Sequence, residues 1–319
     1  RTDTFAYRWE NSSGKSGYSV ACANEWKHGI CYKPQIKCSD CKSRQLLPIT
    51  QEVLYSHLTG QKVIGIYPLL ATDQCRLLAV DFDKSDWKNC VTAFSEACLS
   101  LNIPFLVERS RSGNGAHVWI FFSEPIAAKQ ARLMGAGILD KAMELYPALD
   151  FESYDRMFPN QDHMPAGGFG NLIALPLQKH ARALGNSTFI DSNFNAFTDP
   201  WTVLQQTELM SSSEVNNIVN ELGYNFIEQN QTDVDHEAPW VKNIPKKNQK
   251  IAGCPDAIEL VFANMIHIPI QTLPSQLIAQ LKRLATFSNP RFFKAQAMRF
   301  STTGIPRHIC CARLEGQYL

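Results

Sequence analysis

The chain has 319 residues, of which 45% are apolar and 19% charged, a composition that excludes disorder for the whole and predicts a substantial core. Thirty-one basic and thirty acidic residues leave a formal net charge of +1, so any nucleic-acid surface must come from uneven placement of charge. No run approaches the ~18–20 apolar residues that span a bilayer. We therefore expect no membrane contact.

The first residues and the cysteines bear on where the protein works. The chain starts at Arg1 with a polar stretch and no secretory signal, and we expect a piece of a longer protein. Ten cysteines would suit a short secreted disulfide scaffold, but this chain is long and four of them have metal-like spacing. These features predict a reduced, cytoplasmic protein.

Residues 1–50 are predicted to form a small module, rich in Gly, Ser, Lys and Cys, that a core alone could hardly stabilise. Zn²⁺ takes four soft ligands in a tetrahedron, and a C-x2-C turn supplies two of them. We predict a structural zinc ion without a catalytic role. Free or buried cysteines, or His28 in place of Cys22 or Cys31, are the alternatives. The C-x8-C-x6-C-x2-C pattern consists of Cys22, Cys31, Cys38 and Cys41.

From residue 63 to about residue 199, apolar runs alternate with helical stretches, a pattern typical of an α/β or α+β sheet domain. One helix is indicated by Val91, Phe94, Cys98 and Leu101, which recur at helical spacing. The predicted strands cover 63–70, 76–83, 104–109, 116–122 and 171–177, and the predicted helices cover 87–101 and 127–146.

The strand over 76–83 ends in two acids. Because strand side chains alternate, Leu78, Val80 and Phe82 should point to one face, and Asp81 and Asp83 to the other. Two carboxylates so placed repel each other unless a cation lies between them. Mg²⁺ and Mn²⁺ are bound by such carboxylates together with substrate phosphates, so the pair indicates phosphoryl transfer, although many strands simply end in Asp.

A loop with two glycines and two arginines connects the next two predicted strands and leads to His117. Glycines let backbone N–H groups approach an anion, and Arg109 and Arg111 can add charge-assisted bonds to phosphate oxygens. His117 shares a strand face with Trp119, so a core histidine is the alternative. Together with the acid pair, the loop and the histidine favour a metal-bound triphosphate.

A two-metal site needs a further acid, because both the attacking and the leaving oxygen must be held by ions. Asp155 is the predicted third acid, and the competing residues are Asp150, Glu152 and Asp162. The strand at 171–177 runs into a basic stretch that begins near Lys179, which either meets phosphates or is an ordinary solvated strand end.

After residue 201 the pattern becomes helical, with a polar linker near 228–255 and a last piece from 256 on that is again helical. Between Glu259 and Glu315 there is no acidic residue, whereas seven Lys and Arg residues fall there. This predicts contact with nucleic acid or a basic solvated face; packing on a helicase is a further alternative.

The acid pair, the loop with its histidine and the later acid resemble the three motifs of the archaeo-eukaryotic primase superfamily. The sequence is similar to one branch, the primase-polymerase domains of TOTE conflict systems, which are transposon-associated proteins that join such a domain to a helicase. The similarity runs from about residue 16 to residue 201. It is carried by the stretches 109–122, 153–156, 158–162 and 168–179.

The resemblance implies an α/β (α+β) fold with three parts: a zinc-binding module at 1–50, a catalytic core with an RRM-like sheet at 51–205, and a helical C-terminal region at 206–319. It implies a DNA primase/polymerase that makes or extends primers for a conflict system of a prokaryotic cell. The implied partners are a DNA template and primer, NTP or dNTP substrates, and a helicase domain of the full-length protein.

Carried over residue by residue, the resemblance implies that Asp81, Asp83 and Asp155 hold two Mg²⁺ or Mn²⁺ ions. The implied nucleotide-binding residues are Arg109, Arg111, Ser112, Gly113, Gly115, His117 and Lys179. Two other functions fit the same residues. A metal-dependent nuclease or nicking enzyme would use the same acids but has less use for a triphosphate loop. A non-catalytic, zinc-containing DNA-binding adaptor would use only the module and the basic tail.

Overall fold

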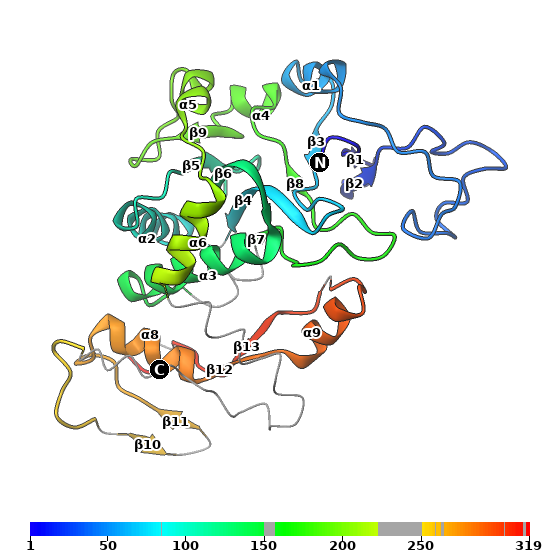
Figure 1. Ribbon diagram of the computed structural model, residues 1–319. Coiled ribbons are helices and arrows are strands. Elements are labelled where there is room, and N and C mark those ends of the chain that lie inside the picture. Colours follow the sequence, from blue (N-terminus) through cyan, green and yellow to red (C-terminus); the bar gives the residue numbers. More distant parts are fainter. Residues whose placement is uncertain are drawn as a thin grey trace.

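A computed structural model gives the structure of the chain. The residues it describes are 1–83, 85–149, 157–222, 251–258, 260–262, 265–302, 304–314 and 317–319. They form a central sheet, a smaller sheet that contains the N-terminal strands, and a C-terminal segment at the bottom of the view in Figure 1. No helix among the described residues has the length and apolar character needed to cross a membrane.

The central sheet has five strands in the order β7-β4-β6-β5-β9, and every neighbouring pair is antiparallel. The chain order β4-α2-β5-β6-α3-β7 gives the β-α-β-β-α-β arrangement that RNA-recognition folds share. The predicted RRM-like sheet is therefore present, with β9 added at one edge. The bounds are β4 Gln74–Phe82, α2 Trp87–Ser100, β5 Leu106–Arg109, β6 Ala116–Ala127, α3 Ala128–Leu145, β7 Met157–Phe158 and β9 Thr188–Ile190.

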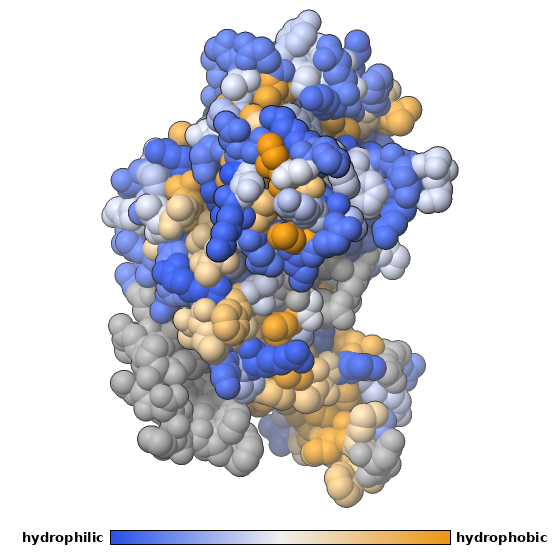
Figure 2. Space-filling view, turned by 90° about the vertical axis from the view of Figure 1, so that its right-hand side faces the viewer, coloured by the Kyte–Doolittle hydropathy of each residue, from blue (hydrophilic) through white to orange (hydrophobic). Residues whose placement is uncertain are grey.

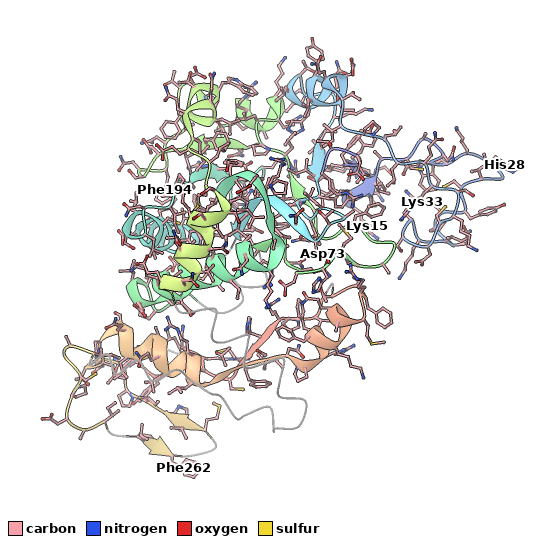
Figure 3. The ribbon with its side chains drawn as sticks, in the orientation of Figure 1. Lys15, His28, Lys33, Asp73, Phe194 and Phe262 are labelled. Carbon is pink, nitrogen blue, oxygen red and sulfur yellow. The ribbon has the colours of Figure 1, made fainter. Side chains whose placement is uncertain are left out.

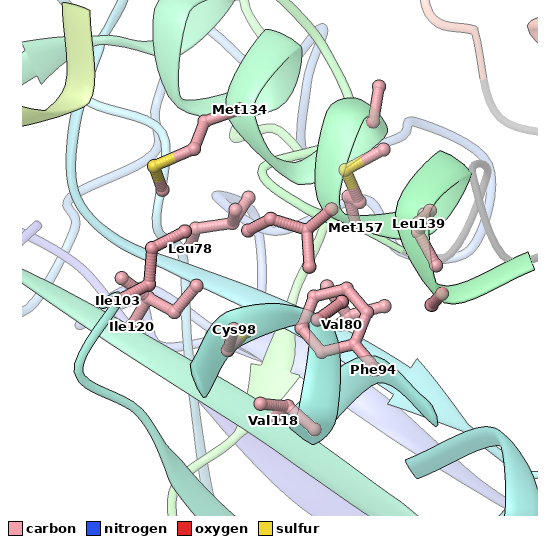
Figure 4. Packing of buried hydrophobic residues seen from close by; sticks show 14 of the residues in the cluster. Leu78, Val80, Phe94, Cys98, Ile103, Val118, Ile120, Met134, Leu139 and Met157 are labelled. Carbon is pink, nitrogen blue, oxygen red and sulfur yellow. The ribbon is translucent and has the colours of Figure 1, made fainter. Parts of the chain in front are cut away.

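Helices α2 and α3 cover one face of this sheet, and the main core lies between them and the strands (Figure 4). Leu78 and Val80 of β4 point into this core, as the alternation of side chains predicts, and Phe94 of α2 packs against them. The opposite face of the sheet buries Ala79 and Trp119 in a second, smaller cluster. The elements predicted over 76–83, 87–101, 104–109, 116–122 and 127–146 are thus confirmed, with shifted ends.

The smaller sheet has the order β2-β1-β3-β8 and crosses the boundary predicted at residue 50. Ala6 of β1 pairs with Gly65 of β3, and Gly65 pairs with Ala174 of β8. Hydrogen-bonded strands thus join residues 1–20 to the rest of the chain, and the part of the module without strands is the cysteine-containing stretch that follows β2. The bounds are β1 Ala6–Glu10, β2 Ser16–Val20, α1 Gln51–Leu58, β3 Ile64–Ile66 and β8 Ile173–Ala174.

Three further helices follow, and their capping residues explain where two of them begin. Asp199 accepts hydrogen bonds from two backbone N–H groups at the start of α5, where Pro200 occupies a first-turn position. Ser211 and Glu214 form a capping box at the start of α6. Val215 and Val219 of α6 are fully buried, and the helix lies where the pattern after residue 201 predicts helical structure. The bounds are α4 Lys179–Ala183, α5 Pro200–Gln206 and α6 Ser212–Glu221.

The C-terminal segment is mixed rather than helical, which corrects the prediction for residues 256–319. It contains two helices and two pairs of short antiparallel strands. The paired residues are up to 24 positions apart in the sequence, as in the pair Thr286 and Cys310. The predicted linker lies outside the described residues as far as position 250. The bounds are β10 Val261–Phe262, β11 Ile266–His267, α8 Ser275–Leu284, β12 Thr286–Ser288, α9 Pro290–Ala297 and β13 His308–Cys310.

A buried cluster of charges attaches this segment to the core. Asp162, 5% exposed, forms ion pairs with Arg132 of α3 and with Arg307 of the C-terminal segment. Its second oxygen also accepts a hydrogen bond from Gln296 of α9 at 2.9 Å, and its backbone N–H donates back to Gln296 at 3.0 Å. Buried charges are tolerated when they are paired and hydrogen-bonded, so this cluster is a specific attachment point.

Other basic residues of the tail also contact the core. Lys282, only 3% exposed, donates to the backbone carbonyls of Pro147 and Leu149. Arg299 forms an ion pair with Asp73 at 3.0 Å, at the boundary seen in Figure 3. Arg283 lies 3.3 Å from Asp140 of α3. These side chains serve attachment to the core, so the excess of basic residues in the tail does not form one open basic face.

The exposed surface of the C-terminal segment is more apolar than that of the core. In the hairpin β10–β11, Phe262 is 82% exposed and Ile266 is 56% exposed. Figure 2 shows mostly hydrophilic residues over the upper part of the face it displays and hydrophobic residues gathered in the lower part, at the level of the C-terminal segment. Figure 3 shows Phe262 at the lower edge of the molecule.

Candidate active site

Three ionisable side chains form a row across the central sheet. Asp81 of β4 lies opposite His117 of β6, and His117 lies opposite Glu108 of β5. Residues that face each other in antiparallel strands project to the same side of the sheet. The row therefore lies on the face away from α2 and α3, at the end of β4 where the predicted acid pair begins.

Glu108 is the anchor of this row, because its carboxylate is 1% exposed and accepts several hydrogen bonds. Its Oε2 accepts from His117 Nδ1 and from Trp119 Nε1, each at 2.9 Å, and its Oε1 accepts from Ser187 Oγ at 3.4 Å. A carboxylate can only accept, so Nδ1 of His117 carries a proton and donates it to Glu108. This directs Nε2 toward Asp81, whose Oδ1 is 3.6 Å away.

The charge state of His117 follows from these neighbours. Burial by itself lowers the pKa of His117, but the charge and hydrogen bond of Glu108, with smaller contributions from Asp81 and Asp83, raise it above its ordinary value. These neighbours therefore favour the cationic form of the imidazole over the neutral form. A cationic ring held by a buried carboxylate is suited to bind a phosphate oxygen.

The loop between β5 and β6 is packed against the end of β4. A Cβ atom on Gly115 would lie 2.5 Å from the carbonyl oxygen of Phe82 and 3.0 Å from Cα of Asp83, so only glycine fits there. Gly113 has a φ of +82°, in the left-handed region that glycine adopts without strain. The structure thus brings the predicted serine and glycine loop directly beside the acid pair.

The other predicted phosphate ligands fall into two groups. Ser112 is exposed at the tip of the loop, where its hydroxyl lies 3.1 Å from that of Ser110. Arg111 lines a cavity described below, and Lys179 is exposed at the start of α4. Arg109 instead donates to the carbonyl of Phe194 at 2.9 Å, beside Trp87 of α2, which places its guanidinium on the helix-covered face (Figure 3). Its neighbour Glu108 points to the opposite side.

The donor set at the end of β4 suits a hard divalent cation, because the side chains of Asp81 and Asp83 offer carboxylate oxygens two residues apart. Asp155, the predicted third acid, lies outside the described residues, as do Asp150 and Glu152. In the part of the chain that the structure describes, no three His, Cys, Asp or Glu side chains converge closely enough to hold a metal ion. The pair is thus the described part of the predicted metal site.

Asp162, the remaining competitor for the third acid, has a different role. Although burial alone raises its pKa, the charges of Arg132 and Arg307 hold the pKa of Asp162 far below its ordinary range. Its carboxylate is already neutralised by two guanidinium groups at the junction with the C-terminal segment. The structure therefore assigns Asp162 to attachment of the tail rather than to metal binding.

The four predicted zinc ligands line one small cavity of about 20 Å³ in the N-terminal part of the chain. Cys22 Sγ accepts a hydrogen bond from the backbone N–H of Gln45 at 3.3 Å. Burial lowers the pKa of Lys33, but its interactions with Glu25 and Cys38 raise it above its ordinary value. His28 is not part of the cavity and lies at the outer tip of the segment in Figure 3.

Glu108 is a site residue that sequence reasoning missed. The sequence shows Glu108 as an acidic residue in an otherwise apolar strand, next to Arg109. Its contact with His117 depends on the pairing of β5 with β6, which the sequence does not show. Because Glu108 acts through His117 rather than on a ligand itself, it is a positioning residue.

Replacing Glu108 with glutamine should weaken nucleotide binding. The amide keeps the size of the side chain but loses the charge, and a charge-assisted hydrogen bond contributes about 1.5–3 kcal/mol, or about 10–100-fold in affinity. Titration of the folded variant with a labelled nucleoside triphosphate measures this. Glu124→Gln, at an exposed position near the other end of β6, is the matched control. Equal affinity for the two variants would contradict the role of Glu108.

Comparison with known proteins gives the family directly. No curated protein sequence matches the chain. The family model described as TOTE conflict system, Archaeo-Eukaryotic Primase domain, matches residues 1–218, which is more than half of the chain and contains both sheets and the whole row from Asp81 to Glu108. The chain therefore belongs to the archaeo-eukaryotic primase domains of TOTE conflict systems.

Proposed function

We propose that this protein is a DNA-dependent nucleotidyltransferase that makes or extends primers. The observation that supports it most is the juxtaposition of Asp81, His117 and the glycine loop at one end of a sheet of the primase family. Divalent cations held by Asp81, Asp83 and Asp155 would activate the attacking 3′-hydroxyl and neutralise the leaving pyrophosphate. Asp155 is two residues before Met157, which pairs with Val80 next to Asp81.

The residues of this chain have separable tasks in that reaction. Asp81 and Asp83 supply the negative charge that holds the cations, and His117, held by Glu108, binds and orients phosphate oxygens of the incoming nucleotide. The loop at 110–115 contributes backbone N–H groups, which approach an anion closely only because its glycines lack side chains. Positioning and charge stabilisation suffice for such a transfer, so no covalent enzyme intermediate is needed.

Incubation of the protein with labelled primer–template, Mg²⁺ or Mn²⁺, and NTPs or dNTPs tests the proposal. Lengthened primers, or new products without a primer, are the expected result. Shortened DNA without consumption of triphosphate would assign the site to the nuclease alternative. Binding without any reaction, unaffected by Mn²⁺ or nucleotide, would assign the chain to the DNA-binding adaptor. As a partner we propose the helicase domain that such systems join to the primase.

We also propose a structural zinc ion at Cys22, Cys31, Cys38 and Cys41, supported by their spacing in the sequence and by the one cavity that all four residues line. As the structure describes them, the four side chains would have to draw closer together to coordinate one ion. Four protein ligands would leave no open position for catalysis. Purified protein should contain one zinc per chain by elemental analysis, and Cys38→Ser should lower both the zinc content and the unfolding temperature. Cys311→Ser, at an exposed cysteine outside the cavity, is the control. Full zinc content in Cys38→Ser would contradict this ligand set.

A further inference from the structure

A second cavity lies beside the active-site row, where β1, the turn after α1 and α4 meet, and its volume is about 530 Å³. Arg8, Lys62, Arg111 and His180 line it, and none of its lining residues is acidic. The chain as a whole carries a formal charge of only +1, so this is a local concentration of positive charge. Such a concentration attracts an anion.

The basic residues of the cavity come from β1, the turn after α1, the glycine loop and α4. Arg8 lies in β1, where Glu10 pairs with it at 2.7 Å, and the amide of Arg8 donates to Val63 next to Lys62. Lys62 Nζ lies 4.4 Å above the ring centre of Tyr7. His180 is packed against Gly60, where a Cβ would lie 2.6 Å from the imidazole Nε2. The side chains of Arg8, Lys62 and His180 are therefore positioned by their neighbours in the fold.

Arg111 connects this cavity to the candidate active site. It belongs to the loop that touches Asp83, and it also lines the cavity. The charges of Arg111, Arg8 and Glu108 all act on the phenol of Tyr18 in β2, so the three groups lie in one neighbourhood. A ligand that contacts Arg111 in the cavity would therefore lie beside the loop that leads to His117.

Size and surroundings favour a chain-like ligand. One water molecule occupies about 30 Å³ of liquid volume. A cavity of about 530 Å³ therefore has room for a ligand much larger than one phosphate group. Two partly exposed aromatic residues are linked to lining residues: Trp9, 39% exposed, follows Arg8 in β1, and Trp201, 43% exposed, lies 5.7 Å from the guanidinium of Arg182, which follows Ala181. A basic groove flanked by exposed aromatic rings is the usual surface for single-stranded nucleic acid.

We propose that this cavity binds the phosphodiester backbone of a single nucleic-acid strand and guides it to the active site, with Arg8 and Lys62 as phosphate ligands. The proposal rests on the proposed function only in taking nucleic acid as the ligand. Strand binding is measured without nucleotide or added divalent cation, so a failure of catalysis and a failure of this groove give different results.

The test is fluorescence anisotropy with a labelled oligodeoxythymidylate of about 20 nucleotides, long enough to exceed the site size of a typical single-strand binding fold. The double variant Arg8→Gln with Lys62→Gln should bind at least about 10-fold more weakly at fixed salt. Its slope of log affinity against log salt, between about 50 and 200 mM, should fall in magnitude by about 1.4, or about 0.7 for each lost phosphate contact. Glu10→Gln, which removes the acid beside Arg8, should bind more tightly.

Lys88→Gln is the matched control, because Lys88 also lies above aromatic rings, 5.4 Å from Phe194 and 5.8 Å from Trp87, but on the helix-covered side of the sheet. It should keep the affinity and the salt slope of the unchanged protein. Circular dichroism checks that the double variant is folded. An unchanged salt slope in the folded double variant would overturn the proposal. So would weaker nucleoside triphosphate binding with unchanged strand binding, since the cavity would then belong to the nucleotide.

Discussion

Asp81→Asn should abolish nucleotide incorporation while leaving the protein folded. The asparagine keeps the shape of the side chain but removes the charge that a divalent cation requires, and metal ions supply several kcal/mol of transition-state stabilisation. At about 1.4 kcal/mol for each factor of ten, the rate should fall about a thousandfold or more. Single-turnover primer extension with Mn²⁺ measures it, and Asp83→Asn should behave similarly.

Two controls separate a loss of catalysis from a loss of folding. Asp81 lies at the end of β4, on the face away from the main core, so Asp81→Asn should unfold at the same temperature as the unchanged protein. Glu124→Gln, the exposed acid near the far end of β6, should extend primers at the normal rate. Undiminished incorporation by Asp81→Asn would end the assignment of the acid pair to metal binding.

The largest loss of stability is expected for Asp162→Ala. The substitution leaves the guanidinium groups of Arg132 and Arg307, 3% and 4% exposed, without the carboxylate that neutralises them. Breaking a buried ion pair by removing one partner typically costs about 3–5 kcal/mol. Chemical denaturation followed by circular dichroism measures the loss. A change below about 1 kcal/mol, the range of exposed pairs, would show that the cluster does not hold the tail to the core.

The same carboxylate predicts a dependence on pH. Because the pKa of Asp162 is lowered in the folded state, its contribution to stability is complete above the ordinary pKa of about 4 and is lost as the pH falls through the lower, folded-state value. The difference in unfolding free energy between the unchanged protein and Asp162→Asn should therefore be constant near neutrality. It should shrink below about pH 4.

Local pattern was sufficient where neighbouring residues decide the structure. The alternation of Leu78, Val80 and Asp81 predicted both β4 and the direction of the acid, and helical spacing predicted α2. The same alternation could have placed Arg109 opposite to Glu108, since adjacent strand residues point to opposite faces. The prediction assigned Arg109 to phosphate binding together with the loop, and so did not separate the two faces of β5.

Pairing between distant segments could not be predicted in this way. Strands β1 and β8 are short, and β1 reaches its partner across some sixty residues, in the pair Ala6 and Gly65. The role of Glu108 depends on the register of β5 against β6, and that of Asp162 on a tail that returns 145 positions later at Arg307. Charge counting along the tail likewise could not show that Lys282 and Arg307 are buried.

The register that aligns Asp81, His117 and Glu108 limits how this sequence can diverge. Side chains alternate with a period of two, so deleting one residue within β4, β5 or β6 would turn one member of the row into the helix-covered core. Length changes in homologous chains should therefore accumulate outside these three strands.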